Sequence, residues 1–253
     1  MCNFASFVLT KDREFYSETG DSHSDIISQN SLHEWGAGGP NIVKVEISPT
    51  AEIKKWPSLR AWEFRIDQDT LPVWADEAEC EKRTRAALQR RAKKGFKTVD
   101  AKGCTALTEL KADAAQTVHA IGCTALTELK ADAATYVYAR GCTALTELKA
   151  DAATYVDARG CTALTELKTD AATYVYASWC TALTELKADA AHTVDASGCT
   201  ALTELKADAA QTVDASGCTA LTELKADAAT YVDASGCNPK LVIKAKKVTK
   251  IYR

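Results

Sequence analysis

Apolar positions recur with a fixed period of 19 residues between Gly103 and Ser235. Seven full copies of a unit such as GCTALTELKADAATYVDAS follow one another there, and an eighth begins at Gly236. Identical spacing over this length predicts a solenoid, in which each coil buries its apolar side against the coils before and after it.

Two alternating stretches lie within each unit. In TELKADA, Leu167, Thr169 and Ala171 are expected on the inner side, and Glu166, Lys168 and Asp170 on the outer side. We therefore expect two short strands per coil, on two faces, each paired with its copies about 4.8 Å away. The remaining apolar positions predict the buried set of one coil: Ala153, Val156, Ala158, Cys161, Leu164 and Leu167.

That buried set reads A-x-x-V-x-A-x-x-C-x-x-L. Over about residues 97–243 it resembles the leucine-rich repeat, L-x-x-L-x-L-x-x-N/C-x-L, with alanine at two leucine positions. The resemblance implies that the cysteine occupies the buried ladder position of that family. Nineteen residues leave no room for a helix on the back of the coil, so we expect a narrow, mostly β coil.

Residues 1–95 are not repetitive. NFASFVLT, NIVKVEIS and AWEFRID alternate like strands, and SHSDIISQNSLHEW predicts a short helix. DEAECEKRTRAALQRRAKKG predicts a helix over 76–94, with Asp76 and Glu79 as its capping box and Gly95 as its stop. GAGG at 36–39 indicates a flexible loop. One helix face is expected to cover the open end of the solenoid, and it carries Cys80, Thr84, Ala87, Leu88 and Arg91.

The expected fold class is therefore α+β. It comprises a small N-terminal α/β capping domain at 1–95 and a mostly β, leucine-rich-repeat-like solenoid of about eight coils at 96–237. Capping strands follow at 238–253, where lysines protect the last edge from aggregation.

Composition narrows the functional classes. The net charge is −3, no apolar run is long enough to cross a membrane, and the N-terminus lacks the pattern of a secretory signal. We therefore expect a cytoplasmic protein whose evenly spaced cysteines are buried free thiols. No cofactor and no metal site are predicted, because ligands along a solenoid axis do not converge on a tetrahedron.

Substitutions gather in one part of the repeat. The twelve residues CTALTELKADAA change only at Thr169, whereas the seven residues before each cysteine keep only their Val and Ala. Strand alternation places the changing positions in three outward rows. The last three units carry plain Asp and Ser there. The predicted binding residues lie mostly in the earlier units: His119, Ile121, Tyr136, Tyr138, Arg140, Tyr155, Asp157, Arg159, Tyr174, Tyr176 and Trp179.

Tyr, Trp and Arg dominate binding hot spots, so we predict that this face recognises a partner macromolecule. A protein is the expected partner. A nucleotide or nucleic-acid ligand is an alternative, because aromatic rings beside arginine can stack a base and hold a phosphate. Drift is another alternative, since stacked tyrosines also stabilise a sheet by themselves.

Two further hypotheses involve other residues. Between Cys104 and Cys237 there are 9 Lys and Arg against 18 Asp and Glu, so the array could mimic nucleic-acid phosphates. Cys2 could act as a nucleophile with its own amine or His23 as the base. With no metal triad, phosphate loop or paired-carboxylate motif, we expect no enzyme, and we expect a surface position for His23.

A second resemblance concerns the N-terminal segment. MCNFASFVLTKD, DSHSDII, NIVKVEISP and RIDQDTLPVWAD resemble the start of a family of uncharacterised bacterial and phage proteins. The resemblance implies a phage or bacterial setting, in which the partner would be a host protein.

Overall fold

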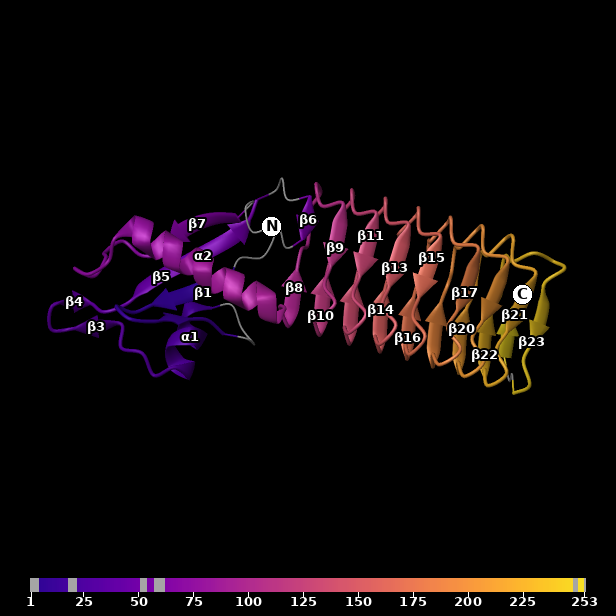
Figure 1. Ribbon diagram of the computed structural model, residues 1–253. Coiled ribbons are helices and arrows are strands. Elements are labelled where there is room, and N and C mark those ends of the chain that lie inside the picture. The colour runs from indigo at the N-terminus through magenta and orange to yellow at the C-terminus, as the bar shows by residue number, and fades with distance from the viewer. Residues whose placement is uncertain (1–4, 18–21, 51–53, 57–61, 248–249, 253) are drawn as a thin grey trace.

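A computed structural model describes residues 5–17, 22–50, 54–56, 62–247 and 250–252. The chain forms a row of stacked coils with a small domain at the N-terminal end (Figure 1). The predicted β-solenoid of about eight coils behind a small N-terminal region is confirmed.

One side of every coil contributes a strand to a nine-stranded parallel sheet, which we call the variable sheet. Neighbouring strands pair in register, so that Val137 lies beside Val118 and Val156. Its strands are β8 (Thr98–Asp100), β10 (Thr117–His119), β12 (Tyr136–Tyr138), β14 (Tyr155–Asp157), β16 (Tyr174–Tyr176), β18 (Thr193–Asp195), β20 (Thr212–Asp214), β22 (Tyr231–Asp233) and β24 (Lys250–Tyr252).

The other side carries the Glu-Leu-Lys strands, which we call the Glu-Lys sheet. Each outward glutamate pairs with the lysine two residues later on six of these strands, as Glu147 does with Lys149 at 2.5 Å. The strands are β9 (Glu109–Lys111), β11 (Glu128–Lys130), β13 (Glu147–Lys149), β15 (Glu166–Lys168), β17 (Glu185–Lys187), β19 (Glu204–Lys206), β21 (Glu223–Lys225) and β23 (Val242–Lys244).

The interior of the solenoid consists of repeated rows of Val, Ala, Cys and Leu. All six predicted core residues of the coil around Val156 are buried. One inward prediction is wrong: Ala171 is exposed, because the strand ends at Lys168 and a turn follows, so that Ala172 points inward instead.

The cysteines form one of these rows. From Cys123 onward, each Sγ donates a hydrogen bond to an alanine carbonyl of a preceding coil, as Cys161 does to Ala139 at 3.1 Å. Burial raises the pKa of the Cys180 thiol to about 12 and that of Cys199 to about 11, so these thiols are unreactive. The predicted free thiols are confirmed from the second coil onward, whereas Cys104 in the first coil is disulfide-bonded.

The N-terminal domain contains the predicted strands and helices. An antiparallel sheet has the order β2 (Glu14–Phe15), β1 (Ala5–Leu9), β5 (Val43–Pro49) and β7 (Trp62–Ile66). The short helix α1 (His23–Gln29) begins at the cap residue Ser22. GAGG, predicted as a flexible loop, is part of a tight hairpin between β3 (Trp35–Gly36) and β4 (Gly39–Pro40).

The long helix α2 (Glu77–Lys94) has the predicted ends and buried face. The Asp76 side chain accepts a hydrogen bond from the Glu79 N–H at 3.0 Å, and Gly95 follows the last turn with φ 83°. Arg91 does not join the buried residues, and its guanidinium lies over the rings of Tyr16 and Phe96. In the part of the chain that the structure describes, no helix has the length and apolarity needed to cross a membrane.

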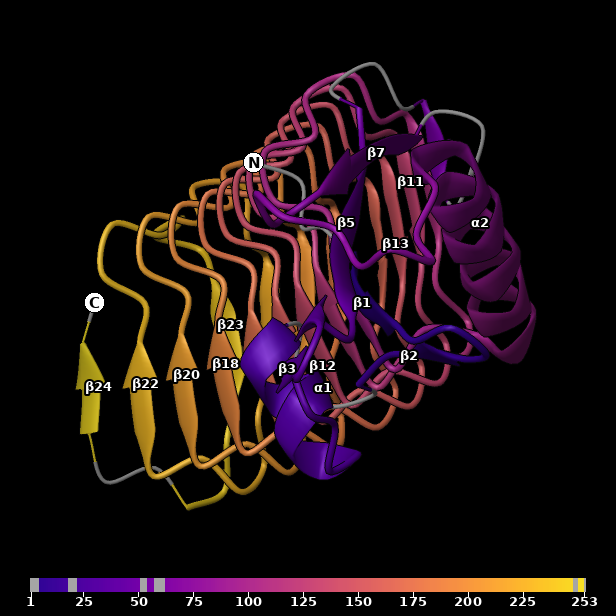
Figure 2. The same ribbon diagram turned by 90° about the vertical axis from the view of Figure 1, so that its left-hand side faces the viewer.

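The N-terminal domain packs against one end of the solenoid, whereas the last two strands form the other end. Viewed along the solenoid, the N-terminal sheet lies in front of the coils and α2 lies to one side (Figure 2). Buried side chains of this sheet and of α2 belong to the same core cluster as the solenoid. β6 (Lys55–Trp56) also pairs with β9 as an edge strand. At the other end, β23 and β24 extend the two sheets, as the lysine-rich segment predicted.

The Glu-Lys sheet is interrupted in the middle of the array. Strands β6, β9, β11, β13 and β15 form one sheet, and β17 to β23 form another. The interruption coincides with Thr169, which replaces the alanine of the six other copies. Its Oγ1 is buried with no hydrogen-bond partner among the described residues. Elsewhere the N–H of Ala150, for example, donates to the Lys168 carbonyl at 3.0 Å.

We expect Thr169→Ala to stabilise the protein. The change removes a buried, unsatisfied hydroxyl, which costs about 1–3 kcal/mol, and allows β15 to pair with β17. Urea unfolding should show a higher midpoint, and amide exchange at residues 184–188 should slow. The matched control is Ala150→Thr in the preceding coil, which should destabilise; a Thr169→Ala chain that unfolds earlier than wild type would contradict this account.

Candidate binding surface

The side chains that point outward from the variable sheet form three rows, and we call this surface the variable face. The first row begins each strand and includes Tyr136, Tyr155 and Tyr174. The second row ends each strand and includes Tyr138 and Tyr176. The third row lies in the following turn and includes Ile121, Arg140, Arg159 and Ser178.

Aromatic rings from successive coils contact one another along this face. His119 and Tyr138 stack with ring centroids 4.8 Å apart. Tyr138 continues to Tyr155 at 5.2 Å, and Tyr155 lies 5.4 Å from Tyr176. Burial lowers the pKa of the His119 imidazole, and the nearby Lys102 ammonium adds to this effect. The four rings therefore form one continuous, half-buried aromatic cluster across four coils, with Tyr155 from the first row and the other three from the second.

An ion pair between Asp157 and Arg159 lies within this aromatic cluster. Asp157 lies between Tyr138 and Tyr176 in the second row and is only 5% exposed. Arg159 binds its carboxylate with two bonds, Nε to Oδ1 at 2.8 Å and Nη2 to Oδ2 at 2.6 Å. The hydrogen bond to Asp157 raises the pKa of the Arg159 guanidinium, which also lies over the Tyr176 ring at 5.5 Å. Asp157 is thus too buried to contact a partner, and its role is to hold Arg159.

The plain Asp and Ser of the later coils have a structural role. Asp214 Oδ1 accepts the backbone N–H of Ser216 at 2.9 Å. Asp195 accepts both the N–H and the hydroxyl of Ser197, at 3.0 and 2.7 Å. Such bonds from an Asp to the backbone two residues later stabilise a tight turn. In these coils the Asp of each Asp-x-Ser segment therefore satisfies a backbone N–H of the turn that follows the strand.

The coils of His119, Tyr138 and Tyr176 lack that bond, whereas Asp157 keeps it by accepting the backbone N–H of Arg159 at 3.2 Å. His119, Tyr138 and Tyr176 occupy the Asp position, and the two tyrosine rings have no oxygen that can reach the turn. The His119 Nδ1 is buried without a hydrogen-bond partner among the described residues. A typical hydrogen bond contributes about 0.5–1.5 kcal/mol, so these aromatics replace a stabilising bond.

Trp179 replaces the glycine that begins each other copy of the unit. Its backbone has φ 63°, in the left-handed region that the corresponding glycines, such as Gly160 at 72°, occupy without strain. The indole is 64% exposed, and it covers Gly198 in the next coil, where an added Cβ would lie only 3.0 Å from the ring. A strained backbone thus holds a large ring on the surface.

The predicted binding residues fall into two groups. His119, Tyr138, Tyr155, Tyr176 and Ile121 are half-buried and pack against their neighbours, and Arg159 is tied to the buried Asp157. The exposed group comprises Tyr136 at 45%, Tyr174 at 44%, Trp179 at 64% and Arg140. Within the described chain, the Arg140 guanidinium forms no ion pair. This exposed group is free to contact another molecule.

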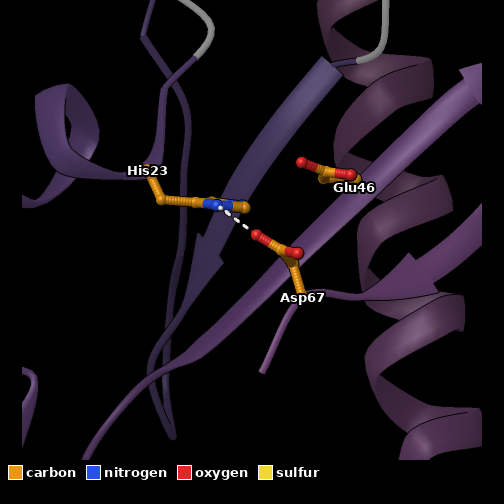
Figure 3. A group of neighbouring side chains, drawn as sticks. All are labelled: His23, Glu46 and Asp67. Carbon is orange, nitrogen blue, oxygen red and sulfur yellow. Dashed lines mark ion pairs between the residues drawn. The ribbon is translucent and has the colours of Figure 1, made fainter. Parts of the chain in front are cut away.

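The two catalytic candidates are not brought together by anything that the structure describes. Cys2 lies outside the described residues. His23 was expected at the surface, but its side chain is only 11% exposed. Its ring points toward Asp67, with Glu46 nearby (Figure 3). Sequence reasoning missed Glu46 and Asp67 because the three residues lie far apart in the chain and form no spacing motif.

Comparisons with protein-family models, curated proteins and solved structures found no match to this chain. The functional argument therefore depends on the variable face and on the His23 cluster.

We expect Trp179→Gly to raise the free energy of unfolding by about 1 kcal/mol, because it removes a non-glycine residue from the left-handed region. Thermal or urea unfolding measures this change. Gly217→Ala is the matched control: at φ 72° its new Cβ would meet only ordinary contacts, and the substitution should destabilise by about the same amount. A destabilised Trp179→Gly chain would mean that the ring is there for packing.

Proposed function

We propose that this protein binds another macromolecule through the variable face, with Tyr136, Arg140, Tyr174 and Trp179 as its main contacts. The observation that carries the proposal is that the coils of Tyr138 and Tyr176 lack the Asp turn bond and carry the exposed aromatic rings of Tyr136, Tyr174 and Trp179. Both changes disfavour the isolated fold. Contacts of these residues with a bound partner would offset that loss of stability.

Sheet stabilisation accounts for only part of the pattern. The half-buried rings of His119, Tyr138, Tyr155 and Tyr176 do contact one another, as cross-strand pairs do. That explanation does not extend to Trp179, which is strained and exposed, or to Arg140, which is exposed and forms no ion pair with the described residues. These two residues favour recognition over drift.

We take a protein as the partner. The exposed contacts span three coils, from β12 to β16, or roughly 10 Å at about 4.8 Å per coil, which fits a peptide segment or a loop. A lone guanidinium among tyrosines and a tryptophan matches the composition of protein hot spots. The leucine-rich-repeat-like order of the core, and the resemblance of the N-terminal segment to bacterial and phage proteins, agree with an interaction protein whose target is a host protein.

The phosphate-mimic hypothesis ranks second. On the Glu-Lys sheet most glutamates are paired with lysines of the same strand. On the variable sheet the plain aspartates accept turn bonds. The carboxylates of these strands are therefore mostly paired or hydrogen-bonded. An acidic row remains only in the turns after the Glu-Lys strands, where Asp132, Asp151 and Asp170 are exposed without an ion pair among the described residues. The aromatic face is the stronger candidate.

The test compares three chains as baits in a lysate of a candidate host, with captured molecules identified by mass spectrometry. The first is the native chain. The second carries Tyr136→Thr, Arg140→Ser, Tyr174→Thr and Trp179→Gly, each change taken from another copy of the same unit. The third carries Tyr231→Thr, the same chemical change in a plain coil. We expect a protein that is captured by the first and third baits and lost by the second.

Single substitutions then measure the affinity for the captured partner. Arg140→Ser or Trp179→Gly should each weaken binding by about 2 kcal/mol, or about 30-fold. If all three baits hold the same partner equally well, the variable face is not the binding surface. Binding that instead falls steeply with salt and captures a DNA-binding protein would favour the phosphate mimic.

A further inference from the structure

We propose that His23, Glu46 and Asp67 form a divalent transition-metal site in the N-terminal domain, separate from the variable face. His23 is the first residue of α1, Glu46 lies in β5, and Asp67 directly follows β7. One ligand atom from each lies within 4.8 Å of the other two. Figure 3 shows the His23 imidazole and the Asp67 carboxylate directed toward each other, with the Glu46 carboxylate nearby.

The hydrogen bond of the His23 ring identifies the nitrogen that faces the carboxylates. His23 Nε2 lies 3.0 Å from the backbone carbonyl oxygen of Val45. A carbonyl only accepts hydrogen bonds, so Nε2 carries a proton and donates it. In the neutral ring Nδ1 then presents a lone pair toward Asp67. Metal-binding histidines commonly use this arrangement, in which a backbone carbonyl holds the other ring nitrogen.

The distance between His23 Nδ1 and the Asp67 carboxylate suits two ligands of the same cation. His23 Nδ1 lies 3.3 Å from Asp67 Oδ2. Ligands about 2.0–2.1 Å from a tetrahedral Zn²⁺ are separated by about 3.3–3.4 Å. Glu46, with its side chain 14% exposed, supplies the third ligand after a small rotation. A fourth position stays open to water or to a small ligand.

The donor set selects the class of metal. One imidazole nitrogen with two carboxylates suits Zn²⁺ and the neighbouring divalent transition metals. Ca²⁺ and Mg²⁺ prefer oxygen ligands alone, and thiolate-preferring ions find no sulfur in this set. Zn²⁺ is therefore the probe of choice.

Arg65 contacts both carboxylates and would compete with a metal ion for them. It lies opposite Glu46 in the pairing of β5 with β7, contacts the Glu46 carboxylate, and lies 3.6 Å from Asp67 Oδ1. Its side chain is 66% exposed, and ion pairs at such exposure are weak. A metal ion can therefore displace the guanidinium into solvent. Removing Arg65 should strengthen metal binding, whereas a purely electrostatic network would only lose a partner.

The experiment is calorimetric titration of Zn²⁺ into the metal-free full chain. We expect one strong site that His23→Ala and Asp67→Asn each weaken at least about tenfold. Arg65→Gln should tighten binding severalfold. The matched control is His33→Ala, a histidine of the same domain outside the cluster, which should leave binding unchanged. Circular dichroism melting shows that each variant is folded, and Asp67→Asn provides the ligand test if His23→Ala is not.

Cobalt spectroscopy separates this site from the cysteines. Co²⁺ bound by one nitrogen and two carboxylates gives weak visible bands without thiolate-to-metal charge transfer. That spectrum, lost in His23→Ala, supports the proposal. A thiolate signal, Zn²⁺ binding unaffected by His23→Ala, or no binding in both the native chain and Arg65→Gln would overturn it.

Discussion

The in-register stacking of identical coils is the constraint on which the rest of the structure depends. Parallel backbone hydrogen bonds hold each strand to its copies, and the same stacking aligns every valine, leucine and cysteine into a buried row. Because the rows are continuous, a residue that suits one coil suits all of them. The constancy of the inward positions follows from this geometry.

Stacking also explains why one buried substitution has a long-range effect. Thr169 adds a methyl group and a hydroxyl to a row of alanines, and the Glu-Lys sheet is interrupted at that coil. The variable sheet continues through the same coils without interruption. The two sheets of a solenoid can therefore differ in continuity, and the surface that carries the exposed aromatic residues is the continuous one.

The variable face and the His23 cluster are two places where the fold holds polar and aromatic groups outside its apolar core. On the variable face, aromatics and Trp179 replace turn bonds and a glycine while the buried rows beneath them stay constant. In the N-terminal domain, the His23 imidazole lies 3.3 Å from the Asp67 carboxylate, beside the exposed Arg65. Both places depend on a rigid sheet beneath them.

The repeat by itself determined the solenoid, its inward rows and the outward position of the variable face, because a fixed period leaves each coil one way to bury its apolar side. The long helix and the edge strands at both ends also followed from local patterns. Only the tertiary structure decided which face residues are exposed: Asp157 is buried between tyrosines and holds Arg159, whereas Trp179 and Arg140 extend into solvent. The His23 cluster was also beyond sequence reasoning, since only the packing of α1 against the N-terminal sheet brings together three residues that are distant in the chain. Contacts between repeated segments can be predicted from the spacing of the sequence, whereas contacts between non-repeating segments depend on the tertiary fold.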